Sequence, residues 1–105
     1  MPFLLQWHTR TPADALALRL LAGDREFRLY GLRSFVIMDH MVQVLVEPRT
    51  ELSTIRAAWE VKQCSHRWVP RPRLAGVIRQ MENLPVRAGL AQRPEQWPWS
   101  SAWED

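Results

Sequence analysis

At 105 residues, the chain is long enough for one domain around a single modest core and too short for two. Its composition, 47% hydrophobic and 24% charged with a net charge of +3, excludes a disordered chain, and no apolar run approaches the ~20 residues that cross a bilayer. The first residues lack the basic flank and long apolar stretch of a signal peptide, and the lone Cys64 excludes a disulfide framework, so we expect a cytoplasmic protein with no membrane partner.

The first half of the chain predicts a strand, a helix and a hairpin. Residues 3–8 form a short strand candidate, and Thr11 caps a helix that Gly23 and Asp24 end. The runs 28–38 and 41–47 are rich in strand-forming side chains. Because only two residues separate these runs, we expect a tight turn and a central hairpin.

The second half predicts two helices and an irregular tail. Apolar residues at helical spacing predict a second helix over about residues 51–67 and a third that begins near Leu74 and that Pro85 ends. The sequence Val-Pro-Arg-Pro at residues 69–72 separates the two helices. Residues 92–103 hold three tryptophans and two prolines, and we expect them to fold against the body.

The order of these elements predicts the fold class. Strand, helix, strand, strand and helix, followed by a third helix, is an α+β plan of the ferredoxin-like kind. We expect a single domain over residues 1–105, with an antiparallel sheet and helices on one face. Its fourth strand is short or missing, and a C-terminal helix and the tryptophan-rich tail are added.

Basic residues gather in the second half of the chain. Of the 14 basic residues all but Lys62 are arginine, whose guanidinium binds phosphate through two hydrogen bonds and stacks on bases. Across residues 56–79 only Glu60 opposes them, which predicts contact with a polyanion, with a solvated basic face as the alternative. The candidate DNA-binding residues, which include one tryptophan for base stacking, are Arg56, Lys62, Arg67, Trp68, Arg71, Arg73, Arg79 and Arg87.

Three stretches carry a resemblance to a known family. Residues 84–90 are Leu-Pro-Val-Arg-Ala-Gly-Leu, residues 97–101 are Trp-Pro-Trp-Ser-Ser, and residues 38–48 are Met-Asp-His-Met-Val-Gln-Val-Leu-Val-Glu-Pro. A weaker stretch follows over residues 52–62. These stretches resemble the REP-associated tyrosine transposases, a branch of the single-tyrosine HUH transposases. The family carries Asn-Pro-Val-Arg-Ala-Gly-Leu, Trp-Pro-Trp-Ser-Ser and Met-Pro-Asn-His-Val-His-Leu-Leu-Val-Glu-Pro.

The resemblance implies a nuclease chemistry whose residues are replaced here. In the family, two histidines on one face of a strand hold a divalent metal such as magnesium or manganese, and a tyrosine on the third helix attacks the phosphorus. The matching positions are Met41, Gln43 and Gln80. His40 lies one residue early and is interpreted as a turn histidine, with a His40–Gln43 metal site as the alternative; Tyr30 is interpreted as a packing residue. We therefore expect no catalytic residue, metal or cofactor.

Two functions from different classes follow. The first is a catalytically degenerate transposase-like domain, not an active enzyme, that binds single-stranded or hairpin DNA without cleaving it. The alternative is a repurposed or decayed transposase remnant that acts through protein contacts.

The segment between the second and third helices is short, so an uncovered sheet edge is expected to pair with a second copy as a homodimer. Trp97 and Trp99 are interpreted as anchors of the tail, with base stacking as the alternative.

Overall fold

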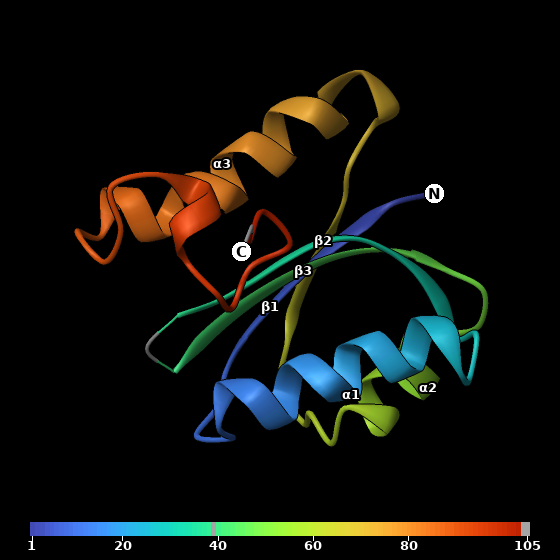
Figure 1. Ribbon diagram of the computed structural model, residues 1–105. Coiled ribbons are helices and arrows are strands. Elements are labelled where there is room, and N and C mark those ends of the chain that lie inside the picture. Colours follow the sequence, from blue (N-terminus) through green and yellow to red (C-terminus); the bar gives the residue numbers. More distant parts are fainter. Residues whose placement is uncertain (39, 104–105) are drawn as a thin grey trace.

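The computed structural model, which describes residues 1–38 and 40–103, contains one antiparallel sheet of four strands in the spatial order β2-β3-β1-β4 (Figure 1). The strands are β1 (Phe3–His8), β2 (Tyr30–Met38), β3 (Met41–Pro48) and β4 (Ser65–Trp68). The helices are α1 (Ala13–Arg25), α2 (Leu52–Ala58) and α3 (Leu74–Arg87), with short 3-10 turns η1 (Arg71–Arg73) and η2 (Pro94–Gln96). The predicted α+β class, the antiparallel sheet and the short fourth strand are confirmed.

Side chains alternate between the two faces of each strand, so the sheet has two different sides. On one side, residues such as Leu5 and Val44 pack with α1 and α2. On the other side, Leu4 and Leu45 pack with Met81 and its neighbours on α3. The pair of helices expected on one face is therefore α1 with α2, and the additional helix lies across the opposite face (Figure 1). We call these sides the α1–α2 face and the α3 face.

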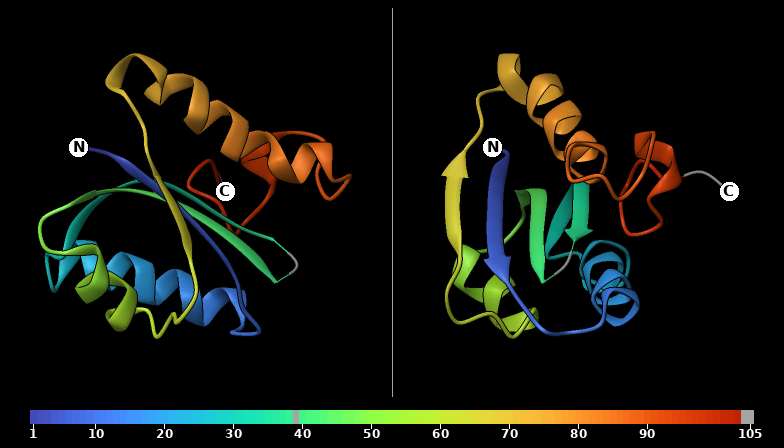
Figure 2. Two further views of the ribbon diagram at one scale, coloured as in Figure 1. Left: turned by 180° about the vertical axis from the view of Figure 1, so that it is seen from behind. Right: turned by 90° about the vertical axis from the view of Figure 1, so that its left-hand side faces the viewer.

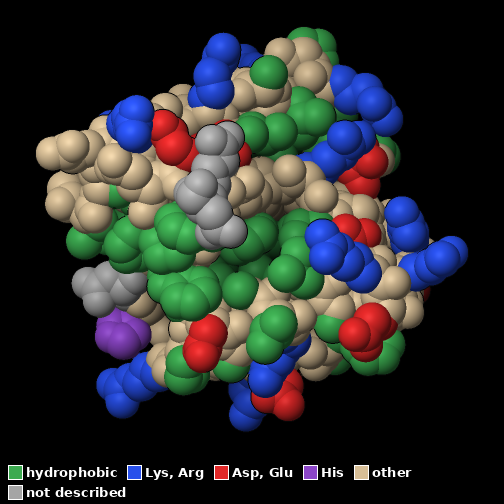
Figure 3. Space-filling model, in the orientation of Figure 1, with side chains coloured by type: hydrophobic (Ala, Val, Ile, Leu, Met, Phe, Trp, Pro, Cys, Tyr) green, Lys and Arg blue, Asp and Glu red, His purple; other side chains and the backbone are tan. Residues whose placement is uncertain are grey.

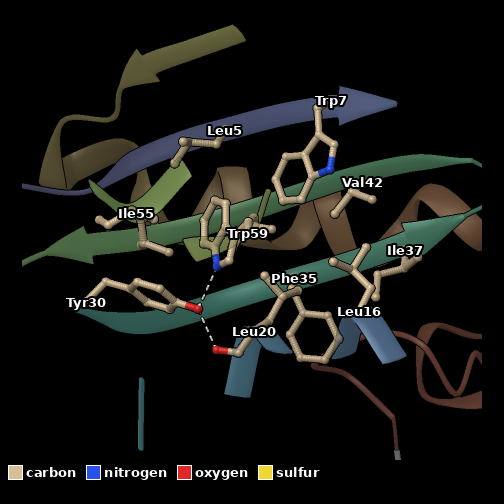
Figure 4. Packing of buried hydrophobic residues seen from close by; sticks show 12 residues of the cluster. Leu5, Trp7, Leu16, Leu20, Tyr30, Phe35, Ile37, Val42, Ile55 and Trp59 are labelled. Atoms are coloured by element: carbon tan, nitrogen blue, oxygen red, sulfur yellow. Dashed lines mark hydrogen bonds between the residues drawn. The ribbon is translucent and has the colours of Figure 1, made fainter. Parts of the chain in front are cut away.

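The larger apolar cluster lies on the α1–α2 face and is organised around Tyr30 (Figure 4). The Tyr30 hydroxyl donates to the Leu20 carbonyl at 2.6 Å and accepts from Trp59 Nε1 at 3.0 Å. Trp59 also stacks on Trp7, with ring centroids 5.0 Å apart. Burial raises the pKa of Tyr30 to about 12, so the hydroxyl stays protonated. The interpretation of Tyr30 as a packing residue is confirmed.

The prediction of a single helix over residues 51–67 is wrong. α2 ends at Ala58, and Glu60 follows in the left-handed conformation with φ 60°. The Val61 amide donates to the Arg56 carbonyl at 2.9 Å and the Glu60 amide to the Ala57 carbonyl at 3.0 Å, which is the Schellman way of closing a helix. The chain then reverses, and Ser65–Trp68 pairs with β1 as β4.

Two other predicted helix ends are wrong. Pro85 lies inside α3, which continues to Arg87 and is closed by Gly89 at φ 77°. Proline is tolerated there because it removes only one hydrogen bond in the last turn, and the Leu90 amide donates to the Pro85 carbonyl at 2.8 Å. Thr11 makes no cap hydrogen bond to α1, whose N-cap residue is Pro12.

The C-terminal tail covers the free edge of β2, as Figure 2 shows. The Ile37 amide donates to the Trp99 carbonyl at 2.8 Å, and Trp97 Nε1 donates to the Ile37 carbonyl at 2.9 Å. Ser101 extends the contact, because its amide donates to the Phe35 carbonyl at 3.0 Å. The predicted folded tail and the anchor role of Trp97 and Trp99 are confirmed. The covered edge leaves β4 as the open edge of the sheet.

No helix within the described part of the chain has the length and apolar character needed to cross a membrane.

Candidate nucleic-acid interface

The α3 face of the sheet is only partly covered by α3. Its covered part is apolar and includes Leu4 and Leu45, which are paired across β1 and β3. The next row on the same face is polar, because Gln6 of β1 pairs with Gln43 of β3 on one side and with Ser65 of β4 on the other. We call Gln6, Gln43 and Ser65 the polar floor. All three side chains are partly or fully exposed.

The positions that the resemblance assigns to catalysis lie on this side of the sheet. Met41 and Gln43 are two residues apart on β3, so both belong to the α3 face. Gln43 Nε2 donates to Gln6 Oε1 at 2.9 Å, so an amide pair stands where the resemblance places a metal-binding histidine. Gln80 lies on α3 and is exposed. None of these three side chains is a nucleophile or a strong metal ligand at neutral pH.

A groove lined by arginines begins between β4 and α3 and continues along the surface of α3. Its first hollow, of about 350 Å³, contains Arg67, Arg73, Arg79 and Gln80, and its second, of about 420 Å³, contains Arg79, Gln80, Asn83 and Arg87. The two hollows share Gly76, where an added Cβ atom would meet no atom within 4 Å. We call this the arginine groove. Four of the eight candidate DNA-binding residues meet in it.

The charges of the arginine groove are not neutralised inside the protein. The ion pairs within the described residues use Arg19, Arg33, Arg71 and Arg93, and none uses an arginine of the groove. Arg67, Arg73, Arg79 and Arg87 are all exposed. Four unneutralised guanidinium groups along one groove create a positive potential that attracts a polyanion.

The remaining candidate residues lie elsewhere. Arg56 and Lys62 belong to the α2 side, where Arg56 Nη2 donates to the Lys62 carbonyl at 3.0 Å. Trp68 is 51% exposed, but alternation along β4 places it on the face opposite Arg67. The structure therefore does not bring Trp68 together with the arginines beside it in the sequence.

Arg71 is held at the margin of the groove by a carboxylate. Glu47, at the end of β3, contacts Arg33 at 3.1 Å and Arg71 at 3.8 Å. The hydrogen bond from Arg33, together with the charges of both arginines, lowers the pKa of Glu47 below its ordinary value of 4.5. This ion-pair cluster ties η1, which precedes α3, to the sheet.

The histidines and the cysteine form no cluster in the part of the chain that the structure describes. No group of three or more histidine, cysteine, aspartate or glutamate side chains there has a metal-binding arrangement. His40 has φ 72° after the end of β2, in agreement with a turn residue; its neighbour Asp39 lies outside the described residues. Cys64 precedes β4, and burial raises the pKa of its thiol.

Sequence reasoning missed the uncharged polar residues that lie near the groove arginines. Asn83 lines the groove beside Gln80, and Gln6 and Ser65 complete the polar floor. A signal for Asn83 was present, because Gly76, Gln80, Asn83 and Arg87 follow the 3-to-4 residue spacing of one helix face. No local signal pointed to Gln6, whose role depends on strand pairing.

Comparison of the chain with models of protein families, with curated proteins and with solved structures finds no match.

Proposed function

We propose that the protein is a catalytically degenerate relative of the single-tyrosine HUH transposases that binds single-stranded or hairpin DNA in the cytoplasm and does not cleave it. The observation that carries the proposal is the arginine groove, which lies beside the sheet face that bears Met41 and Gln43. The relation to the family rests on the sequence resemblance. The place of Gln80, which stands at the position of the family's tyrosine, in the arginine groove is in keeping with that relation.

The shape of the groove favours a single strand over a duplex. From Arg73 to Arg87 the helix advances about 21 Å at 1.5 Å per residue, and the groove follows this length. Proteins that hold single strands combine such a charged groove with contacts to unpaired bases. A duplex reader instead places a helix or a β-ribbon in the major groove, whereas here α3 packs on the sheet along its apolar side.

Binding without cleavage follows from the residues at the site. Phosphodiester cleavage in the family needs a bound metal and a tyrosine nucleophile, and the corresponding Met41, Gln43 and Gln80 supply neither. The proposed phosphate contacts use guanidinium groups and need no metal. Manganese or magnesium is therefore not expected to raise the affinity and, like other added salt, should weaken the phosphate contacts.

The test is fluorescence anisotropy of a labelled single strand and a labelled hairpin, titrated with the protein at low and moderate salt, with and without manganese. For single strands, the logarithm of the binding constant falls with log salt by about 0.7 per phosphate contact. Arg67→Ala with Arg79→Ala is expected to reduce this slope by about 1.4. Arg25→Ala, an exposed arginine of α1, is the matched control and should change nothing. Absence of binding at every salt concentration contradicts the proposal.

A second candidate function, contact with another protein, is favoured by the apolar surface. Figure 3 shows a band of hydrophobic side chains between α3 with its tail and α1. Leu18 of α1 is 70% exposed, and Phe27 just after this helix is 66% exposed. Contiguous exposed apolar surface marks protein interaction sites. Salt separates the two functions, because raised salt weakens phosphate contacts and not an apolar interface.

A further inference from the structure

Two of the four glycines lie inside helices, and only one of them has a packing reason. A Cβ atom added to Gly23 of α1 would collide with the Tyr30 hydroxyl oxygen. A Cβ atom added to Gly76 of α3 would meet no atom within 4 Å, and the backbone of Gly76 has no positive φ. Glycine destabilises a helix relative to alanine. Neither packing nor backbone conformation within the described residues explains why residue 76 is glycine.

Gly76 lies where the two hollows of the arginine groove meet. It lines the hollow of about 350 Å³ beside β4 and also the hollow of about 420 Å³ farther along α3. The other residues common to both hollows are Arg79 and Gln80. Because no protein atom surrounds the place of an added Cβ, a longer side chain at residue 76 would extend into the groove.

Arginines flank Gly76 on both sides. Arg73 precedes it by three residues and Arg79 follows it by three. In helical geometry each lies about 60° around the axis and about 4.5 Å along it, in opposite directions. Both arginines are exposed, and neither belongs to an ion pair within the described residues. A phosphate chain that lies against the helix at Gly76 therefore passes between two available guanidinium groups.

The lining of the groove favours the sugar–phosphate backbone over a base at this point. Proteins bind unpaired bases by stacking them on aromatic side chains. Among the described residues, no aromatic side chain lines either hollow. Guanidinium groups, in contrast, match the geometry of phosphate.

We propose that the single strand crosses α3 at Gly76, with its sugar–phosphate backbone against the helix and its phosphates bound in turn by Arg73 and Arg79. This proposal rests on the proposed function, because it specifies which part of that ligand approaches the protein most closely, and where. Glycine allows such a close approach of two backbones. Gly76 is thus a positioning residue that acts through the two arginines.

The first test is Gly76→Leu, which removes no charge. Leucine should hold the strand away from both arginines, so the salt slope of binding should fall by about 1.4, the value for two lost phosphate contacts. Anisotropy with a thymine strand of about 12 nucleotides measures the slope. Ala15→Leu adds leucine at an exposed position of α1 and, as the matched control, should change nothing. An unchanged slope for Gly76→Leu overturns the crossing point.

Unfolding measurements separate a loss of binding from a loss of fold. Gly76→Ala should raise the ratio of folded to unfolded protein about 2- to 5-fold, because alanine favours the helix and its Cβ meets no neighbour. It should also weaken DNA binding, by less than Gly76→Leu does. Urea unfolding followed by circular dichroism gives the stability of each variant. If Gly76→Ala is less stable than the unaltered protein, Gly76 serves the fold and the proposal is wrong.

A combined variant tests whether Gly76 acts through the arginines. Arg73→Ala with Arg79→Ala should lower the salt slope by about 1.4, and adding Gly76→Leu to this pair should lower it no further. A second fall of the same size would show that Gly76 acts independently of Arg73 and Arg79, contrary to the proposal.

A strand without bases tests which part of the ligand lies at Gly76. An abasic strand of the same length keeps its phosphates, so Gly76→Leu should lower its salt slope by the same amount, about 1.4. If the slope falls only for the strand with bases, a base lies at Gly76 and the proposal is wrong.

The outcomes also separate this proposal from the proposed function. Binding by the unaltered protein with the same salt slope for Gly76→Leu contradicts the crossing point and leaves the DNA-binding function standing. If no strand binds at any salt concentration, both proposals are wrong.

Discussion

The two faces of the sheet differ in what covers them. The α1–α2 face is closed by two helices over a cluster that includes three buried aromatic rings joined by stacking and hydrogen bonds, those of Trp7, Tyr30 and Trp59. The α3 face is closed by one helix over a smaller cluster, and beyond it lie the polar floor and the arginine groove. The larger apolar cluster thus lies on one side of the sheet, and the exposed arginines and glutamines lie on the other.

If the proposed relation to the transposases holds, this difference explains how the domain could lose catalysis and keep its fold. The residues at the replaced catalytic positions are partly or fully exposed and lie outside the apolar clusters. Changes at such positions usually alter stability by about 0.5 kcal/mol or less. The Tyr30 network, by contrast, tolerates little change: a Cβ atom on Gly23 would lie 2.3 Å from the Tyr30 hydroxyl oxygen.

The largest expected effect concerns the α1–α2 face. Trp59→Ala removes a 2% exposed indole that contacts Trp7 and Tyr30, and we expect the free energy of unfolding to fall by about 3–5 kcal/mol. Trp68→Ala, at the open edge, is the matched tryptophan control and should cost about 1 kcal/mol or less. Urea unfolding followed by circular dichroism measures both. Equal losses for the two variants would contradict the assignment of stability to this face.

The second prediction concerns the basic residues on the two faces. Arg73→Ala with Arg87→Ala removes two exposed arginines of the groove, and the salt slope of single-strand binding should fall by about 1.4. Lys62→Ala removes a charge on the α2 side and should leave the slope unchanged. Anisotropy titrations between 50 and 200 mM salt, the range over which phosphate contacts change affinity strongly, measure the slope. A larger fall in the salt slope for Lys62→Ala than for the double variant would indicate that the DNA binds on the α1–α2 face, which contradicts the proposal.

A third prediction concerns the pH dependence of stability at the ion-pair cluster. The folded-state pKa of Glu47 lies below 4.5, so its carboxylate contributes stability that is complete above this pH and is lost as the pH falls toward the lowered value. Glu47→Gln should therefore flatten the fall in the free energy of unfolding below pH 4.5. Unfolding curves recorded across this range for both proteins test it. If the free energy of unfolding falls with pH in the same way for both proteins, the Arg33–Glu47–Arg71 cluster contributes nothing to stability.

The smallest expected effect is self-association at the open edge. β4 has four residues, all exposed, and its outer backbone groups have no strand partner among the described residues. Such an edge pairs with another strand, here that of a second copy, and so short a strand predicts a weak, concentration-dependent dimer. Sedimentation velocity over a range of protein concentrations measures it. A strictly monomeric protein at all concentrations contradicts the homodimer.

The sequence predicted those elements whose signals are local. The strands of the central hairpin, β1 and α1 were recognised because strand formers and helical spacing mark them. The end of α2 was missed because its stop is Glu60, a residue type that seldom adopts a positive φ. The fourth strand was expected to be short or missing, but its place at Ser65–Trp68 was not recognised because these exposed residues have no apolar alternation. Gly89 rather than Pro85 closes α3.

The candidate site was predicted only in part, for a different reason. The arginines over residues 56–79 were recognised as a linear stretch, but the reversal after α2 divides them between two faces. Arg67 and Trp68 are neighbours in sequence and point to opposite sides of β4. The Gln6–Gln43 pair joins residues 37 positions apart, so only the strand register reveals it.

The central claim is that the α3 face, and not the α1–α2 face, receives single-stranded DNA. Nuclear magnetic resonance of the ¹⁵N-labelled protein titrated with an unlabelled single strand tests this claim most directly. We predict that the largest amide shifts arise at Arg67, Gly76, Arg79, Gln80 and Asn83, with little change along α1. Shifts concentrated on α1 and α2, or none at saturating DNA, would contradict the account.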